Sequence, residues 1–147
     1  TRFIELAGEI NTAMPSHVIR KLTDALNERG EAVNGADVIV VGLAYKKDIS
    51  DPRESPAFEI IDGLLARGAN VSYHDPHIPV APPMRSWPDL PPLRSIDVDE
   101  ESLRTSAAVV IVTDHTVIDF ERIARFAPVV IDTRGVLRGA GRNVVPA

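Results

Sequence analysis

Basic residues cluster directly after one apolar run of the chain. Residues 38–41 read Val-Ile-Val-Val, and they are followed by a glycine, an aromatic residue and two lysines: Gly42, Tyr45, Lys46 and Lys47. Arg53 comes next, and the pair Ser55-Pro56 is typical of a helix start, with serine as the N-cap and proline at the first helical position. A buried strand, a basic loop and a helix N-terminus together form a corner that binds anions. The spacing therefore predicts a site for a phosphate or a diphosphate.

Polar residues also follow three other apolar runs that we expect to be strands. They are Asp75 after residues 70–73, Thr113, Asp114 and His115 after residues 107–112, and Asp132 and Arg134 after residues 129–131. In a parallel sheet the carboxyl ends of the strands meet at one edge, and ligands bind outside that edge. Four separate strand ends are therefore expected to present polar groups on one side of the sheet.

Strands and helices alternate along this sequence. The strands are continuous apolar runs, which favours a parallel sheet covered on both faces. Helices are expected after the first strand, over residues 100–104 and around residues 120–124, and a short edge strand is expected at residues 143–145. Residues 76–92 hold seven of the twelve prolines and should form an irregular loop. The predicted fold class is α/β: a three-layer Rossmann-like parallel sheet with helices on both faces, preceded by an N-terminal helical segment.

The N-terminal segment has the apolar spacing of a helix. Its stripe consists of Phe3, Ala7, Ile10 and Met14. Pro15 is expected to end or kink this helix, and a second helix is expected over residues 16–29, with Ser16 as a possible N-cap. The first helix has more apolar surface than one small sheet covers, so we expect it to pack against a second copy or another domain. The alternative is a helix folded back on its own sheet.

The composition bounds the class of protein. The chain of 147 residues is long enough for one domain with a core, and its net charge of -5 gives no indication of nucleic-acid binding. The chain has no cysteine, which excludes disulfides, thiolate metal sites and a cysteine nucleophile within it and fits a cytoplasmic location. No apolar run is long enough to span a membrane. Because the chain opens at Thr1 inside a helical pattern, we expect a fragment of a longer protein.

Several motifs together resemble the C-terminal domain of the UDP-glucose/GDP-mannose dehydrogenase family. They are Gly42-Leu-Ala-Tyr-Lys-Lys-Asp, Asp51-Pro-Arg-Glu-Ser-Pro-Ala, Tyr73-His-Asp-Pro, Val112-Thr-Asp-His and Ile131-Asp-Thr-Arg-Gly, with Ile10-Asn11 and Met14-Pro15 resembling the end of the family's central helix. The resemblance covers nearly the whole chain. The last two strand-end motifs are more similar to the branch that acts on UDP-N-acetylhexosamines than to the UDP-glucose branch.

The resemblance implies a division of the chain and an activity. Residues 1–30 would end a central helical dimerisation region, and residues 31–147 would form the UDP-sugar-binding domain of a homodimeric bacterial enzyme of polysaccharide biosynthesis. Family members oxidise the C6 alcohol of the sugar to a carboxylate with NAD, which an N-terminal Rossmann domain binds, and a cysteine carries the intermediate. The substrate would be a UDP-N-acetylhexosamine such as UDP-ManNAc or UDP-GlcNAc. This chain has neither the cysteine nor a Gly-x-Gly-x-x-Gly motif, so alone it should be inactive.

The resemblance also assigns roles to residues. Tyr45, Lys46 and Arg134 would bind the UDP-sugar, and Arg53 would lie near the NAD; no residue of this chain is assigned a catalytic role. Each has an alternative: Lys46 as a solvated loop lysine, and Arg53 in an ion pair with Asp51 or Glu54. The other candidates are left open in the same way: Asp75 as a turn former or a ribose ligand, Asp114 as a helix cap, His115 facing the uracil or ribose, and Trp87 as a cover for the core or a platform for a base. The spacing of His74, Asp75 and His77 does not favour a metal site, and none is expected.

Two other functions compete with the enzyme fragment. One is a stand-alone nucleotide-binding or regulatory module without catalysis. The other is a receiver-like signalling domain, which needs an acidic cluster and a phosphoacceptor aspartate after the first strand. The loop after residues 38–41 is Tyr-Lys-Lys instead, so the sequence disfavours a receiver.

Overall fold

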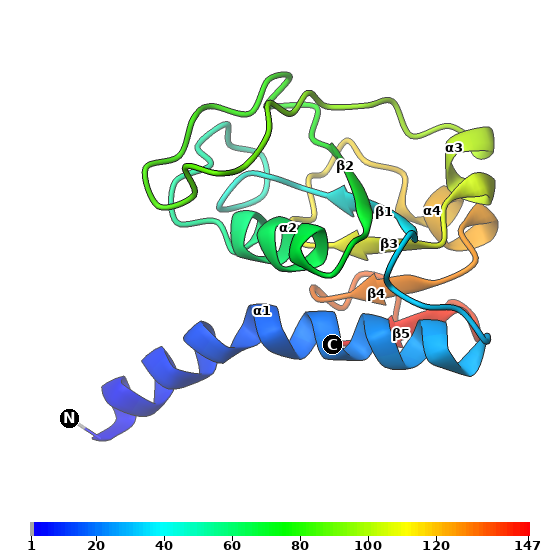
Figure 1. Ribbon diagram of the computed structural model, residues 1–147, viewed down its shortest axis with the longest axis horizontal. Coiled ribbons are helices and arrows are strands. Elements are labelled where there is room, and N and C mark those ends of the chain that lie inside the picture. Colours follow the sequence, from blue (N-terminus) through cyan, green and yellow to red (C-terminus); the bar gives the residue numbers. More distant parts are fainter. Residues whose placement is uncertain (1) are drawn as a thin grey trace.

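The chain forms one parallel sheet with helices on both faces (Figure 1). The computed structural model describes residues 2–147, apart from the side chains of residues 6–12. The strands are β1 (Asp37–Val41), β2 (Asn70–His74), β3 (Ala108–Ile111), β4 (Val130–Asp132) and β5 (Val144–Pro146), and the helices are α1 (Arg2–Glu28), α2 (Ala57–Ala66), α3 (Glu100–Thr105) and α4 (Phe120–Phe126). All four neighbouring strand pairs are parallel, in the order β2-β1-β3-β4-β5. The predicted fold class is confirmed.

The alternation of side chains along each strand separates two apolar clusters. Val38 and Val40 of β1 pack with α1 and α2 on one face of the sheet, whereas Ile39 and Val41 pack with α3 and α4 on the other. From β1 the chain continues to β2 on one side of β1 and then to β3 on its other side. The strand order therefore reverses between β1 and β3. In open α/β sheets this point at the carboxyl edge is where ligands bind.

The N-terminal helix differs from the expected pair of helices. α1 is one helix of 27 residues with Pro15 inside it, so Ser16 is not an N-cap and no separate second helix forms. Proline cannot donate a backbone hydrogen bond, and in Figure 1 the helix changes direction along its length, so that its first part leaves the body of the domain. The second part is held by tertiary packing, because Leu22 and Leu26 are fully buried against α2 and the sheet.

The first part of α1 has exposed apolar side chains where the structure describes them. Phe3 is 80% exposed and Ile4 is 68% exposed. The helix is therefore not folded back on its own sheet at these positions. The predicted contributions of Ala7, Ile10 and Asn11 lie outside the described side chains. Met14 is half-buried and packs against the cluster on the α1 side of the sheet.

The start of α2 differs by one residue from the expectation that Ser55 is the N-cap and Pro56 the first helical residue. α2 begins at Ala57, one residue later than expected, with Pro56 at the N-cap position, while the Ser55 hydroxyl accepts a hydrogen bond from the Ala57 amide at 3.2 Å. The proline-rich segment 76–92 contains no helix, and Trp87 in it packs against the core, as expected for a cover.

Among the described residues, no helix is long and apolar enough to cross a membrane.

Candidate functional site

A groove at the carboxyl edge of the sheet brings together residues from both ends of the chain. It has a volume of about 470 Å³ and is lined by Met14, Tyr45, Lys46, Glu54, Pro56, Thr133 and Arg134. The loop after β1 supplies Tyr45 and Lys46, and the loop after β4 supplies Arg134. The three residues predicted to bind substrate therefore line one groove. The strand ends bring them together although they are up to 89 positions apart in the sequence (134 minus 45).

The cationic end of Lys46 is available to a ligand. Its ammonium lies 5.6 Å from the centre of the Tyr45 ring, within range of a weak cation–π contact. The side chain is exposed and has no ion pair in the part of the chain that the structure describes. Tyr45 itself is 42% exposed and lines the groove.

Arg134 is anchored at its base and unpartnered at its tip. Its backbone amide donates to the carboxylate of the buried Asp132 at 3.0 Å, and its Nε donates to the carbonyl of Val112 at 2.7 Å. Among the described residues, its two terminal guanidinium nitrogens have no hydrogen-bond partner. A guanidinium fixed in this way presents two N–H donors in a fork, the geometry that suits a phosphate.

Arg53 lies outside the groove lining. Its guanidinium pairs with Asp51, with the terminal nitrogen 2.8 Å from one carboxylate oxygen and Nε 3.0 Å from the other. The hydrogen bonds from Arg53 lower the pKa of Asp51 to about 2. This pair is the alternative that the sequence left open. The assignment of Arg53 to NAD stays a prediction. Because Arg53 does not line the groove, a contact with NAD would lie outside it.

Asp75 is a buried structural anchor and not a ligand of a ribose. It is fully buried, and one of its carboxylate oxygens accepts from the amides of Leu43 and Ala44 at 2.7 and 2.9 Å. The other oxygen accepts from the His77 amide at 2.8 Å, which closes the expected Asp-Pro turn. Burial raises the pKa of this carboxyl, but hydrogen bonds from His115 and the backbone amides outweigh it and lower the pKa below its usual value. Asp75 is therefore an anion that holds the start of the β1 loop.

His115 is buried too, so of the roles that the sequence left open, a contact with the uracil or ribose is not the one that the structure favours. It is fully buried, and its Nε2 lies 2.9 Å from the Asp75 carboxylate. Its Nδ1 accepts from the Asp48 amide at 2.8 Å. Asp114 was interpreted as a helix cap, but the cap of α4 is Asp119, whose side chain accepts from the Arg122 amide. The sequence named both residues but could not fix their roles, because position after a strand does not reveal which way a side chain points.

One cluster has the residue types of a metal site. Asp48, His77 and His115 have potential ligand atoms within 4.8 Å of one another, and His77 Nε2 is buried without a hydrogen-bond partner. However, the His115 Nδ1 lone pair already accepts from the Asp48 amide, and the Asp48 carboxylate accepts from the amide and hydroxyl of Thr116. His74 is not part of this cluster, because its Nδ1 bonds to the Ile96 carbonyl. The geometry favours a loop support over a metal centre.

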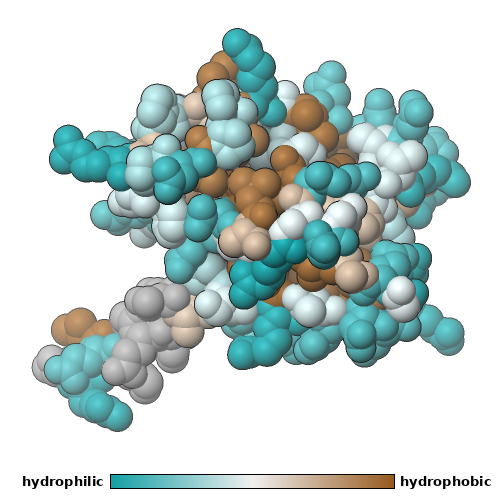
Figure 2. Space-filling model, viewed as in Figure 1, coloured by the Kyte–Doolittle hydropathy of each residue, from teal (hydrophilic) through white to brown (hydrophobic). Residues whose placement is uncertain are grey.

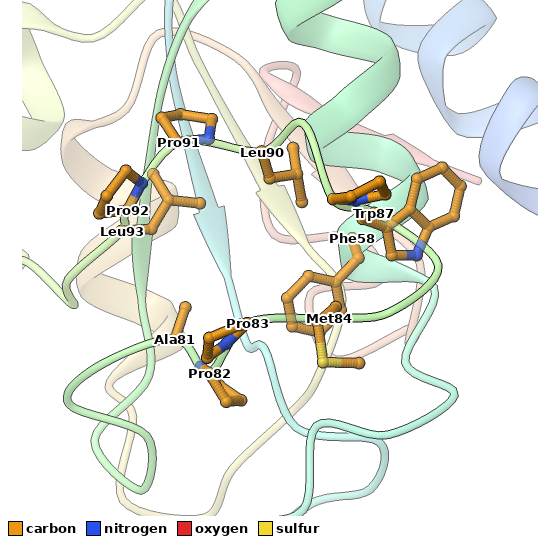
Figure 3. Close-up of a pocket in the computed structure, with 11 residues that line it drawn as sticks. Phe58, Ala81, Pro82, Pro83, Met84, Trp87, Leu90, Pro91, Pro92 and Leu93 are labelled. Carbon is orange, nitrogen blue, oxygen red and sulfur yellow. The ribbon is translucent and has the colours of Figure 1, made fainter.

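A second pocket is apolar and offers no charge to an anion. It has a volume of about 210 Å³, and Figure 3 shows Phe58 of α2 pointing toward Met84 while the proline-rich loop with Trp87 and Leu90 curves around it. Figure 2 shows apolar side chains exposed in the middle of the face that Figure 1 presents. Lysine and arginine are absent from the lining of this pocket. A phosphate-bearing ligand therefore fits the groove at the sheet edge and not this pocket.

Comparison with known proteins gives a consistent result. Residues 39–139 match the model of the UDP-glucose/GDP-mannose dehydrogenase family, UDP binding domain. The chain is 32% identical over 144 residues to a UDP-N-acetyl-D-mannosamine dehydrogenase of Methanococcus maripaludis, covering 92% of this chain and 31% of the relative. It is 33% identical over 139 residues to an NDP-N-acetyl-D-galactosaminuronic acid dehydrogenase of Ralstonia nicotianae, covering 92% of this chain and 30% of that protein.

Solved structures share the fold across nearly the whole chain. A UDP-D-ManNAc dehydrogenase from Pyrococcus horikoshii superposes with a TM-score of 0.76 at 25% identity, covering 99% of this chain and 33% of that one. An NDP-N-acetyl-D-galactosaminuronic acid dehydrogenase from Methanosarcina mazei gives the same TM-score at 28% identity, covering 97% and 30%. The chain thus spans about a third of the length of the relatives it matches.

Proposed function

The chain belongs to the UDP-glucose/GDP-mannose dehydrogenase family, as its UDP-binding domain, and we propose that the groove between the β1 and β4 loops binds the diphosphate of a UDP-sugar. The observation that carries this proposal is that Lys46 and Arg134 line the same groove. These two cations come from different strand ends, line one groove and have no acidic partner among the described residues. Two cations that line one groove and form no ion pair with the described residues fit a ligand with two negative phosphoryl groups.

The groove residues divide the recognition between them. Lys46 supplies a point charge, and Arg134 supplies a bidentate fork for the phosphate oxygens. Tyr45 offers a ring and a hydroxyl, and Met14 forms an apolar wall. Glu54 also lines the groove, where a carboxylate can accept hydrogen bonds from sugar hydroxyls.

For the whole protein we propose an NAD-dependent nucleotide-sugar 6-dehydrogenase. The C6 alcohol of a UDP-N-acetylhexosamine, such as UDP-ManNAc or UDP-GlcNAc, would be oxidised to the carboxylate. The names of the relatives support the hexosamine class. NAD would be bound mainly by an N-terminal domain, with Arg53 reaching it from this one. The present chain, without cysteine, would bind substrate and show no turnover alone, and its lack of cysteine is consistent with a cytoplasmic site of action.

The groove assignment is tested by titrating UDP into the protein and following amide shifts by NMR. We expect a dissociation constant between high micromolar and millimolar, roughly 4 to 6 kcal/mol of binding free energy, because this domain supplies only part of the site. Lys46→Ala and Arg134→Ala should each weaken binding about tenfold, since each removes a charged hydrogen bond to phosphate. The matched control is Lys47→Ala, which removes the neighbouring lysine, outside the groove lining, and should leave the affinity unchanged.

The shift map locates the site independently of the variants. Residues 43–55 and 133–135 should respond to UDP. Shifts confined to the proline-rich pocket, or equal losses of affinity in the Lys46 and Lys47 variants, would show that the diphosphate binds elsewhere.

We also propose that residues 1–30 end a dimerisation region and residues 31–147 form the binding domain. The support is the projecting first part of α1, where Phe3 and Ile4 are exposed. Sedimentation velocity should show self-association of the whole chain, because the hydrophobic effect favours covering such side chains with a second copy. Removal of residues 1–13 should give a monomer with an unchanged melting temperature, since Met14 and the buried part of α1 remain. A monomeric full chain whose stability falls on truncation would place the segment in the domain's own core instead.

A further inference from the structure

The loop that carries Tyr45 and Lys46 adopts a costly backbone conformation. Between β1 and α2 it contains no helix or strand, and two of its non-glycine residues, Asp48 and Glu54, have a φ of 63°. Residues other than glycine are seldom found in this left-handed region, and each such residue costs about 1–3 kcal/mol. Contacts with the rest of the domain must therefore hold the loop in place.

Hydrogen bonds tie the loop on both sides of Tyr45 and Lys46. Before them, the amides of Leu43 and Ala44 donate to Asp75. After them, the Asp48 amide donates to His115 Nδ1 at 2.8 Å. The Asp48 carboxylate in return accepts from the Thr116 amide at 2.8 Å and from its hydroxyl at 2.5 Å. The two groove residues thus lie on a short span fixed at both ends.

The hydrogen bonds on the two sides of Tyr45 and Lys46 meet at one buried pair of residues, Asp75 and His115. The same Asp75 oxygen that accepts from Leu43 and Ala44 lies 2.9 Å from His115 Nε2. Because Asp75 is an anion, it fixes the proton of the imidazole on Nε2, and the lone pair is left on Nδ1. Only this neutral tautomer can accept from the Asp48 amide. His77 packs edge-on against the ring of His115 at 4.5 Å between centroids and limits its rotation.

We propose that His115 is a positioning residue of the UDP site: its Nε2–H tautomer, set by Asp75, holds the Tyr45–Lys46 loop in the conformation that binds the diphosphate. Its effect on binding rests on the proposed function of the groove. His115 does not touch the ligand, since it is fully buried. It acts through the Asp48 amide, so the two ring nitrogens have separate tasks that can be removed one at a time.

Three substitutions at position 115 separate these tasks. In His115→Asn the amide oxygen stands in for Nδ1 and can accept from the Asp48 amide, but the side chain does not reach Asp75. In His115→Gln the amide nitrogen stands in for Nε2 and can donate to Asp75, but the Asp48 amide has no acceptor. His115→Phe keeps a ring and removes both hydrogen bonds. We expect UDP affinity to fall at least tenfold in the Phe and Gln variants and by less than about threefold in the Asn variant.

A matched core variant controls for loss of stability alone. Ile123→Val shortens a buried side chain in the cluster of α3 and α4, away from the groove lining, and should destabilise the domain without changing UDP affinity. All affinities are measured at a temperature well below the melting point of each variant. Equal affinity in the wild type and the Phe variant would overturn the proposal, and so would rescue by Gln and not by Asn.

The hydrogen bonds that link Asp75, His115 and the Asp48 amide form a clamp on the loop. Two further measurements test this clamp without any ligand. Long-range proton–nitrogen NMR of the imidazole should show a protonated Nε2 and an unprotonated Nδ1 in the wild type. The Asp48 amide should be protected from hydrogen exchange in the wild type and the Asn variant, and exposed in the Phe and Gln variants. If the wild type fails to bind UDP while these signatures hold, the function proposed for the groove is wrong and the clamp stands. The opposite tautomer, or an unprotected Asp48 amide in the wild type, refutes the clamp whatever UDP does.

Discussion

Replacing Asp75 with alanine is expected to lower the free energy of unfolding by about 3–5 kcal/mol, the range seen when one partner of a buried charged network is removed. The variant leaves four donors without their acceptor: the amides of Leu43, Ala44 and His77, and Nε2 of His115. The carboxylate is fully buried, so its removal also opens a cavity that water must fill or that the loops must close. Urea unfolding of the two proteins, followed by circular dichroism, gives the difference.

Asp51→Ala is the matched control for Asp75→Ala. It also removes a hydrogen-bonded carboxylate of the segment between β1 and α2, but Asp51 is solvent-accessible and its partner Arg53 is exposed, so the stability should barely change. If the two aspartate variants lost similar stability, burial would not be what makes Asp75 important, and its role as the anchor of the β1 loop would have to be abandoned.

The stabilisation from Asp75 should also depend on pH in a defined direction. The pKa of its carboxyl in the folded protein lies below that of the unfolded chain, because the hydrogen bonds outweigh the effect of burial. The contribution is therefore complete above the unfolded pKa of about 3.9 and is lost as the pH falls through the folded value. The gap in stability between the wild type and Asp75→Ala should therefore narrow as the pH falls through this acid range.

The sheet could be predicted because its signals are local. Val38 to Val41 form a short, continuous apolar run, and such runs alternate with helical patterns along the chain, which is enough to indicate a parallel sheet. The same logic placed Tyr45, Lys46 and Arg134 near one another, because all three follow the carboxyl ends of strands. The order of strands and helices was enough to predict that these residues share one edge of the sheet, without knowledge of any contact.

The buried anchors could not be predicted because their partners are distant in the sequence. Asp75 contacts amides 31 and 32 positions away, and His115 contacts Asp75 over 40 positions. A strand end is polar whether its side chain faces a ligand or turns inward, so position alone could not separate His115 from Arg134. Pro15 was expected to end or kink the helix by its local chemistry; it does not end it, and the packing of α1 on α2 holds the second part in place. The same packing brings Met14 to the groove, which no sequence signal indicated.

Gly42→Ala is expected to cost about 3 kcal/mol or more, because it combines a strained backbone with a steric clash. Gly42 follows β1 directly and has a φ of 95°, and an added Cβ would clash with Cβ of Thr113 and lie 2.5 Å from its amide nitrogen and 2.7 Å from its Cα. The backbone of Thr113 cannot move away cheaply. Its amide donates to the carbonyl of Val41, and its hydroxyl donates to the carbonyl of Ala44 at 2.6 Å.

A second glycine separates the strain from the clash. Gly35 has a φ of 83°, but an added Cβ would meet nothing within 4 Å, so Gly35→Ala should cost only the backbone strain, about 1 kcal/mol. The excess loss in Gly42→Ala, measured by urea unfolding, then reports the close approach of the β1 and β3 loops. This approach lies where the strand order reverses, and it sets the spacing between the loop that carries Lys46 and the loop that carries His115. Equal losses at the two glycines would mean that the β3 loop yields to the new methyl group, and such a loop would be too soft to hold the β1 loop in place.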